Sequence, residues 1–255
     1  MECFFAFILG LIVGSFLNVC IYRIPKGKSV VLPPSSCPNC GSPIAWYDNI
    51  PVISYLILKG KCRHCGEKIS IRYPLVEILT ALMTLAVTCK FGVSFDLFYY
   101  LILVYYLIVI SFIDIDTMEI PVKFSYFALI LGIILSPLSR NVGLIDSVLG
   151  ASFGAGIILF IIETYYILTG KEGMGYGDAN IMAVIGAFLG WKLVPVALFF
   201  ASLIGTAVGI TLMVLKKKDR RLALPFGPFL AAGALTALFY GREILNWYLE
   251  GIGTC

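Results

Sequence analysis

The segment FDLFYYLILVYYLIVISFID covers residues 95–114 and decides the fold class. Between Leu97 and Ile113 it carries no charged side chain. Apolar runs of about this length are typical of helices that cross a membrane. The run ends at Asp114, and a carboxylate at the edge of a membrane span usually faces an interior cavity and carries function. The segment therefore predicts both a membrane helix and a candidate functional residue.

The composition of the whole chain agrees with this segment. Of 255 residues, 60% are hydrophobic and only 13% are charged, and the mean hydropathy is +0.95. An ordinary soluble domain is about one quarter charged, so that class is excluded. We predict an all-α polytopic membrane protein with about eight transmembrane helices. The predicted spans are residues 4–22, 75–93, 95–113, 123–139, 144–168, 178–191, 193–215 and 222–241.

The first apolar run is expected to stay in the protein. It has no basic residue before it and no small-residue cleavage site after it, which are the marks of a secretory signal peptide. We therefore interpret residues 1–22 as a retained first transmembrane helix.

The positions of lysine and arginine predict the orientation in the membrane. If the loop of residues 23–74 is cytoplasmic, fifteen of the nineteen basic residues lie inside, five of them in residues 216–221. Cytoplasmic loops carry such an excess, so both termini are expected on the other side. Asp114 and Asp178 then share the cytoplasmic edge. This pattern depends on the span 178–191, which is short for a full crossing.

Four of the eight cysteines form two CxxC motifs in the predicted cytoplasmic loop. They are Cys37-Pro-Asn-Cys40 and Cys62-Arg-His-Cys65, separated by 21 residues. Two such motifs are a strong signal for tetrahedral zinc, because each presents two thiolates to one ion. The alternative is a pair of disulfides, which needs an oxidising compartment. His64 is a possible alternative ligand. We expect a small zinc-knuckle domain over residues 23–74, whose fold is stabilised by the bound metal.

Asp178 is the second candidate carboxylate. Alternating glycines precede it, at Gly173, Gly175 and Gly177. Glycine allows close approach of a neighbouring chain, so Gly175 and Gly177 are expected to shape the backbone around Asp178. Two neighbouring carboxyl groups do not both ionise readily, so they share a proton and can activate a water, as in aspartic proteolysis. A phosphate-binding loop does not fit, since no GK[ST] sequence follows.

Other interpretations of the aspartates stay open at this point. Asp116 competes with Asp114, but two residues turn a helix by about 200°, so only one of them can face a given partner. Both Asp114 and Asp178 could be polar helix ends at the headgroup level. A proton-coupled transporter could use them as a relay. In a third reading, the chain is an assembly scaffold whose cysteine loop docks partners.

Several motifs in order resemble one known family, the type IV prepilin peptidases of bacterial pilus and type II secretion systems. These enzymes are both leader peptidases and N-methyltransferases. The resemblance covers nearly the whole chain. It is carried by the paired CxxC motifs and by GSFLNVCIYRIP (14–25), WYDNIPVISYL (46–56), SIRYPLVE (70–77), FIDID (112–116) and GMGYGDANIMAVIGA (173–187).

The resemblance implies a function and its residues. It implies cleavage of a basic prepilin or pseudopilin leader after glycine, at the cytoplasmic face of the bacterial inner membrane, by Asp114 and Asp178. It also implies methylation of the new N-terminus with S-adenosylmethionine. Candidate residues for methyl transfer are Gly60, Arg72 and Glu77, and the Zn²⁺ ligands are Cys37, Cys40, Cys62 and Cys65.

The resemblance also divides the chain and names its partners. Residues 23–74 are linked to methyl transfer and residues 75–255 form the peptidase domain. Prepilins and membrane lipids are the expected partners, without nucleic acid. The sequence departs from the family pattern at Ile120-Pro121-Val122, where many members have Leu-Pro-Asp, and at Thr117, where histidine is common.

Overall fold

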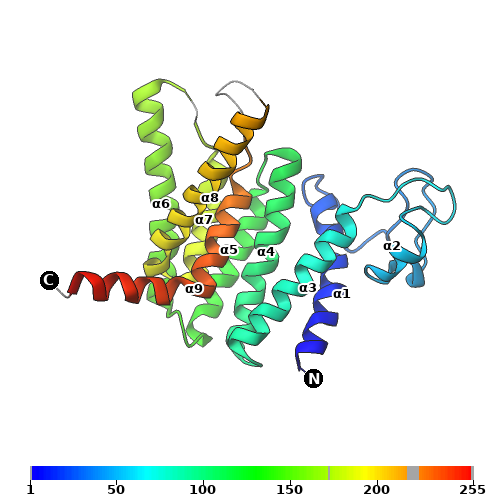
Figure 1. Cartoon of the computed structure of the whole chain (residues 1–255), viewed down its shortest axis with the longest axis horizontal. Helices are drawn as coiled ribbons and strands as arrows, with labels where there is room; N and C mark the ends of the chain where they lie inside the picture. Colours follow the sequence, from blue (N-terminus) through cyan, green and yellow to red (C-terminus); the bar gives the residue numbers. More distant parts are fainter. Residues whose placement is uncertain (1, 172, 217–223, 254–255) are drawn as a thin grey trace. The chain divides into compact units, whose positions relative to one another are not determined.

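The computed structural model describes residues 2–171, 173–216 and 224–253 (Figure 1). Within these ranges the regular structure is helical, with two isolated β-bridges and no strand. The all-α prediction is confirmed. The chain forms two compact units, Met1–Leu97 and Phe98–Cys255. The basic segment 216–221 and the start of the predicted span 222–241 lie largely outside the described residues.

The first unit is built on two antiparallel helices. It contains α1 (Glu2–Arg23), η1 (Trp46–Asn49), α2 (Ile53–Ile57) and α3 (Arg72–Phe91). On α1, Gly10 and Gly14 face α3 so closely that a Cβ on Gly14 would lie 2.7 Å from the Cα of Glu77. One turn later, the Asn18 amide donates to the Tyr73 carbonyl at 3.1 Å. Small residues four apart let two helices touch backbone to backbone, as membrane helix pairs do.

The second unit contains the remaining helices. They are α4 (Phe95–Thr117), α5 (Val122–Leu135), η2 (Ser136–Leu138), α6 (Leu144–Thr169), α7 (Tyr176–Leu189), η3 (Trp191–Leu193), α8 (Val194–Lys216) and α9 (Gly227–Gly253). The core of this unit is α7, on which Asp178, Ala179 and every residue from Ile181 to Leu189 are buried. A helix that is apolar on all sides needs neighbours on all sides.

Glycine contacts and one tyrosine hold the neighbours against α7. Gly150 of α6 and Gly186 of α7 pack backbone to backbone, so that a Cβ on either would collide with the other's carbonyl oxygen. The buried Tyr99 hydroxyl of α4 donates toward two carbonyl oxygens, at 3.2 Å to Gly132 of α5 and 3.0 Å to Ala187 of α7. Asp114 lies near the end of α4 and Asp178 near the start of α7. This packing therefore fixes the positions of both aspartates.

Five of the described helical segments are long and apolar enough to cross a membrane. They are Glu2–Arg23, Arg72–Phe91, Phe95–Thr117, Leu144–Thr169 and Trp191–Leu215. Two shorter apolar segments, Val122–Leu138 and Tyr176–Leu189, accompany them. With 14 residues, α7 is about 21 Å long, less than the apolar thickness of a bilayer of about 30 Å. The expectation of about eight spans therefore stays a prediction.

Candidate functional site

Asp114 lies near the end of α4 with its carboxyl group buried. Its exposed fraction is 4%. The backbone N–H of Gly227, the first residue of α9, donates to its Oδ2 at 2.8 Å. A Cβ on Gly227 would lie only 2.8 Å from the same oxygen. The N-terminus of a helix attracts negative charge, so the start of α9 forms a fitting environment for this carboxylate.

Asp178 lies in the first turn of α7 and is 5% exposed. Its backbone N–H donates to the carbonyl of Gly175, the N-cap residue, at 3.1 Å. Its side chain is close enough to that of Asp114 for the two carboxyl groups to interact electrostatically. The structure thus brings together the two buried aspartates that the sequence places on different helices.

The glycines before Asp178 differ in what they do. A Cβ on Gly177 would lie 2.7 Å from the Cδ1 of Ile120, in the link between α4 and α5. Gly177 therefore lets the start of α7 approach the segment that follows Asp114. The nearest atom to a Cβ on Gly175 is 3.9 Å away, at Gly177 N. Close packing demands glycine at 177 but not at 175.

Nearby acidic residues have other surroundings. Asp116 is exposed, as the helical rotation predicts when Asp114 faces inward. Glu163 of α6 is also exposed and accepts a hydrogen bond from the Tyr176 hydroxyl at 2.9 Å. This bond ties the start of α7 to α6. Neither group shares the buried position of Asp114 and Asp178.

Sequence reasoning missed Gly227 as a member of this site. The signal is present in retrospect: Pro225-Phe226-Gly227-Pro228 places a glycine between two prolines at the entrance of an apolar helix. Proline is favoured in the first turn of a helix, which marks this position as a helix start. The sequence alone does not say which side chain that start would meet.

The four CxxC cysteines form one cluster in the first unit. The sulfur atoms of Cys37, Cys40, Cys62 and Cys65 all lie within 4.8 Å of one another, and the thiols are free. The sulfurs of Cys37 and Cys65, one from each motif, lie 3.8 Å apart. These positions favour a metal centre over the two disulfides that the sequence left open. Four converging sulfurs suit a tetrahedral Zn²⁺ ion.

The two CxxC motifs are built alike. The N–H of Cys37 donates to the Ser42 carbonyl at 2.9 Å, and that of Cys62 donates to the Glu67 carbonyl at 2.8 Å. Each turn closes on a glycine in the left-handed region, Gly41 at φ 71° and Gly66 at φ 73°. Such a turn leaves two thiols on one side. The matching backbone explains how separate segments offer equivalent ligands.

Local hydrogen bonds adjust the charge of the thiols. A hydrogen bond with Ser42 lowers the pKa of Cys40 to about 6. The backbone N–H groups of Cys65 and His64 lower the pKa of Cys62. For Cys65 the N–H of Glu67 acts in the same direction, but burial and the other three thiols outweigh it and raise the pKa to about 11. Metal binds the thiolate form, which part of this cluster already favours.

An ion pair joins the second CxxC motif to η1. Arg63 donates from Nε and from its terminal nitrogen to the two carboxylate oxygens of Asp48, at 2.8 and 2.6 Å. This two-point contact lowers the pKa of Asp48 and fixes the motif against the Trp46–Asn49 turn.

The three candidate residues for methyl transfer are not part of the cysteine cluster. Gly60 has φ 66°, and a Cβ there would lie 3.0 Å from the Tyr55 ring, so its local packing requires glycine. Arg72 begins α3 and is half-buried. Glu77 is buried within α3, where its Oε2 accepts the N–H of Val52 at 2.8 Å. Of the three, Glu77 has the setting of a buried functional group.

Comparisons with known proteins match both parts of the chain. Residues 8–91 match the family model described as the bacterial peptidase A24 N-terminal domain. Residues 101–210 match the type IV leader peptidase family. None of the solved structures matches the chain.

Curated relatives extend the match to nearly the full length. Each of three is named prepilin leader peptidase/N-methyltransferase. The Aeromonas hydrophila protein is 38% identical, over 95% of this chain and 92% of the relative. The Pseudomonas aeruginosa protein is 36% identical, over 96% and 93%. The Legionella pneumophila protein is 35% identical, over 95% and 92%. The chain therefore belongs to the type IV leader peptidase family, and it is an enzyme of that family.

Proposed function

We propose that this enzyme removes the leader peptide of type IV prepilins or pseudopilins, cutting after a glycine with Asp114 and Asp178. One observation carries the proposal: two buried carboxyl groups from different helices converge at the start of α7, beside the N-terminus of α9. The names of the relatives supply the substrate class. Those names also favour a peptidase over a proton-coupled transporter.

The chemistry follows from two neighbouring carboxyl groups that share one proton. The ionised member takes a proton from a water molecule, and the protonated member donates a hydrogen bond to the scissile carbonyl. The oxygen of that water attacks the carbonyl carbon. The bond from this carbon to the peptide nitrogen then breaks, and the carboxyl group that took the water's proton gives it to the departing amine. The Gly227 N–H and the start of α9 hold Asp114 in place, while the close approach at Gly177 holds Asp178. Both groups act from helix ends that are anchored by packing.

We assign methyl transfer to the N-terminal part of the chain. In this proposal residues 1–22 are a membrane helix, residues 23–74 form the zinc-binding domain linked to methyl transfer, and residues 75–255 form the peptidase domain. S-adenosylmethionine supplies the methyl group for the new N-terminal amine. The cysteine cluster would hold Zn²⁺ as a structural ion, because four thiols complete its coordination.

The proposal includes a membrane orientation. About eight crossings, with α7 as a short buried one, place residues 23–74 and both aspartates on the cytoplasmic side of the bacterial inner membrane. Prepilins and membrane lipids are the partners, without nucleic acid. A prepilin with a basic leader and an apolar helix would meet such a site at the membrane edge.

Cleavage of a purified prepilin tests the peptidase. We expect Asp114→Asn and Asp178→Asn each to reduce the cleavage rate by at least a thousandfold, on the order of losing an essential acid–base group. The matched control is Asp116→Asn, a change of the same chemistry two residues away on an exposed position, which should cleave like the wild type. Normal cleavage by either buried variant would place the active site elsewhere.

A further inference from the structure

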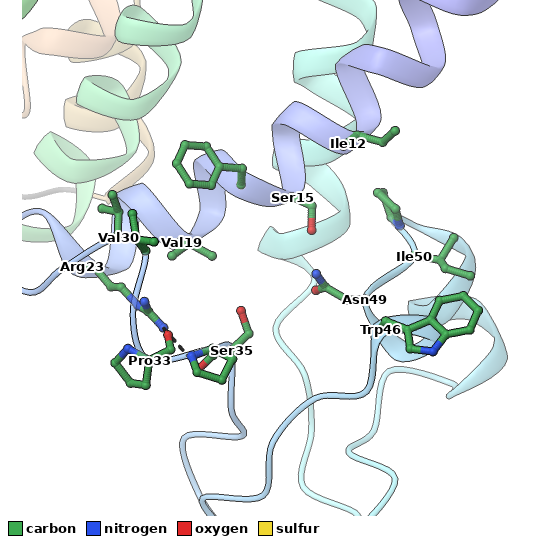
Figure 2. Close-up of a pocket in the computed structure, with 14 residues that line it drawn as sticks. Ile12, Ser15, Val19, Arg23, Val30, Pro33, Ser35, Trp46, Asn49 and Ile50 are labelled. Carbon is green, nitrogen blue, oxygen red and sulfur yellow. Dashed lines mark hydrogen bonds between the residues drawn. The ribbon is translucent and has the colours of Figure 1, made fainter.

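A pocket of the first unit lies between α1 and the loop that follows it. Its volume is about 540 Å³, which is within the usual range of small-molecule sites. Figure 2 shows Arg23 near one end, Trp46 near the other, and Ser15 and Asn49 facing each other between them. The remaining wall is mainly apolar. A ligand that fits would have a negative end, a polar centre and a flat apolar end.

Arg23 offers a positive charge at the first end. Its guanidinium donates to the backbone carbonyl of Pro33 at 2.8 Å (Figure 2) and to that of Ser29 at 3.0 Å, and these bonds hold it against the loop. Among the described residues, the side-chain hydrogen bonds of Arg23 all go to backbone carbonyls, with Pro34 as a third at 3.5 Å. The charge of Arg23 therefore faces carbonyl dipoles rather than a carboxylate, and it can still attract an anionic group.

The centre of the pocket is backed by the buried carboxyl group of Glu77. Ser15, which lines the pocket, hydrogen-bonds to it. The second partner is the Val52 N–H at 2.8 Å, one residue after Pro51 of the pocket wall. Glu77 thus lies directly behind the polar centre. A negative charge in that position attracts a cation bound in the pocket.

The backbone that presents Val52 is strained. Val52 has φ 61° and ψ −48°, and the following N–H of Ile53 donates back to the Pro51 carbonyl at 2.6 Å. This is a γ-turn at positive φ, a conformation that a β-branched residue rarely adopts. Strained turns persist where surrounding structure enforces them, and they gather at functional sites. Here the turn directs one N–H at Glu77.

Trp46 supplies a flat surface at the far end. Its side chain is 82% exposed, although it is among the most readily buried of large side chains. Its described ring contact is an edge contact with Tyr47, at 5.7 Å between centroids. The indole face can therefore accept a stacked aromatic ring, and an adenine ring is one that such side chains commonly bind.

We infer that this pocket binds S-adenosylmethionine, with its carboxylate at Arg23, its sulfonium beside Ser15 and Glu77, and its adenine on Trp46. The order of groups along the ligand is the order of groups along the pocket. The inference rests on the methyl transfer of the proposed function and deepens it. It assigns Arg23, Ser15 and Trp46 to ligand binding, and it gives Glu77 the role of attracting the sulfonium charge.

Binding of the ligand to the purified full-length protein tests the inference without measuring activity. Isothermal titration calorimetry would compare S-adenosylmethionine with S-adenosylhomocysteine, which lacks the positive charge. Trp46→Ala should raise the Kd of both ligands about tenfold, which is the effect of losing one stacked ring. The matched control is Trp247→Ala, a tryptophan that is 76% exposed in the second unit, and it should bind both like the wild type.

Glu77 and Arg23 are tested by charge. Glu77→Gln removes the negative charge but can still accept the Val52 N–H. It should therefore raise the Kd of S-adenosylmethionine roughly tenfold while changing that of S-adenosylhomocysteine less than about twofold. Substituting Arg23 would also disturb the loop that it holds. Its role is therefore tested by changing the ligand instead of the protein. Methylthioadenosine, which has no carboxylate, should bind the wild type more weakly than S-adenosylhomocysteine and should keep its dependence on Trp46.

The outcomes separate this inference from the proposed function. If Trp46→Ala and Glu77→Gln bind both ligands like the wild type, while the wild type methylates cleaved prepilin, the pocket is not the ligand site and methyl transfer stands. If native mass spectrometry shows a phospholipid bound by the wild type and lost in Trp46→Ala, with unchanged S-adenosylmethionine affinity, the pocket is a lipid site. A wild type that neither binds nor methylates contradicts the proposed methyl transfer itself.

Discussion

The carboxylate of Asp114 is held by the backbone N–H of a residue 113 positions later in the chain. The helical rotation predicted that only one of Asp114 and Asp116 faces inward, and the burial of Asp114 beside an exposed Asp116 confirms that part. Such a prediction needs only the local periodicity. The contact with Gly227 depends on how the start of α9 meets the end of α4, so no local sequence pattern predicts it.

This contact leads to a prediction for Gly227. In Gly227→Ala the new Cβ would meet the Asp114 carboxylate oxygen at 2.8 Å, so either α9 or the carboxylate must move. We expect prepilin cleavage to fall by about a hundredfold, as displacements near 1 Å do in enzyme sites. The rate of cleavage by purified protein is the measurement.

The control for Gly227→Ala is a glycine in open space. A Cβ on Gly156 of α6 meets no atom within 4 Å, and alanine favours a helix interior over glycine. Gly156→Ala should therefore keep the wild-type rate and at least the wild-type thermal stability. Equal rates for Gly227→Ala and Gly156→Ala would show that the contact with Asp114 is not needed.

At the scale of elements, the cysteine cluster was the most predictable feature. Two CxxC turns are each determined by a few neighbouring residues, and their convergence follows from the coordination of one ion. The surroundings of the candidate methyl-transfer residues were less predictable. Buried Glu77 accepts a hydrogen bond from the strained turn at Val52, and a strained backbone has no signature in hydropathy or spacing.

The cluster predicts the metal content of the purified protein. We expect about one zinc per chain, measured by elemental mass spectrometry, and loss of zinc in Cys62→Ser. Since the loop has few other means of holding its fold, residues 24–71 should then be cut faster by protease. A chelator strong enough to remove the zinc should give the same digestion pattern.

Cys89→Ser is the matched control for zinc binding. Cys89 is exposed on α3 and lies 3.8 Å from the Cys3 sulfur, outside the four-cysteine cluster. This variant should keep its zinc and resist protease like the wild type. Full zinc content in Cys62→Ser would mean that the ion is held by other groups.

At the scale of the whole molecule, composition and apolar runs were enough to predict a helical membrane protein, but they did not fix the number of crossings. The difficulty is α7, which is apolar because it is buried among other helices and is short for a bilayer. Hydropathy measures transfer out of water and does not distinguish lipid from protein as the destination. The charge pattern carries the orientation, and it needs a separate test.

Native cysteines provide that test. Cys3 and Cys89 lie at the ends of α1 and α3 that are opposite to the 23–74 loop, and both are exposed. In reduced intact spheroplasts, a membrane-impermeant maleimide should label these two thiols and spare Cys40 and Cys65. In inverted membrane vesicles treated with a zinc chelator, the labelling should reverse. All variants are made in a Cys255→Ser background, because the C-terminus is expected on the same side as Cys3 and Cys89. In that background the added changes Cys3→Ser and Cys89→Ser should remove the spheroplast signal. Labelling of Cys40 in sealed spheroplasts would invert the proposed topology, and with it the cytoplasmic placement of Asp114 and Asp178.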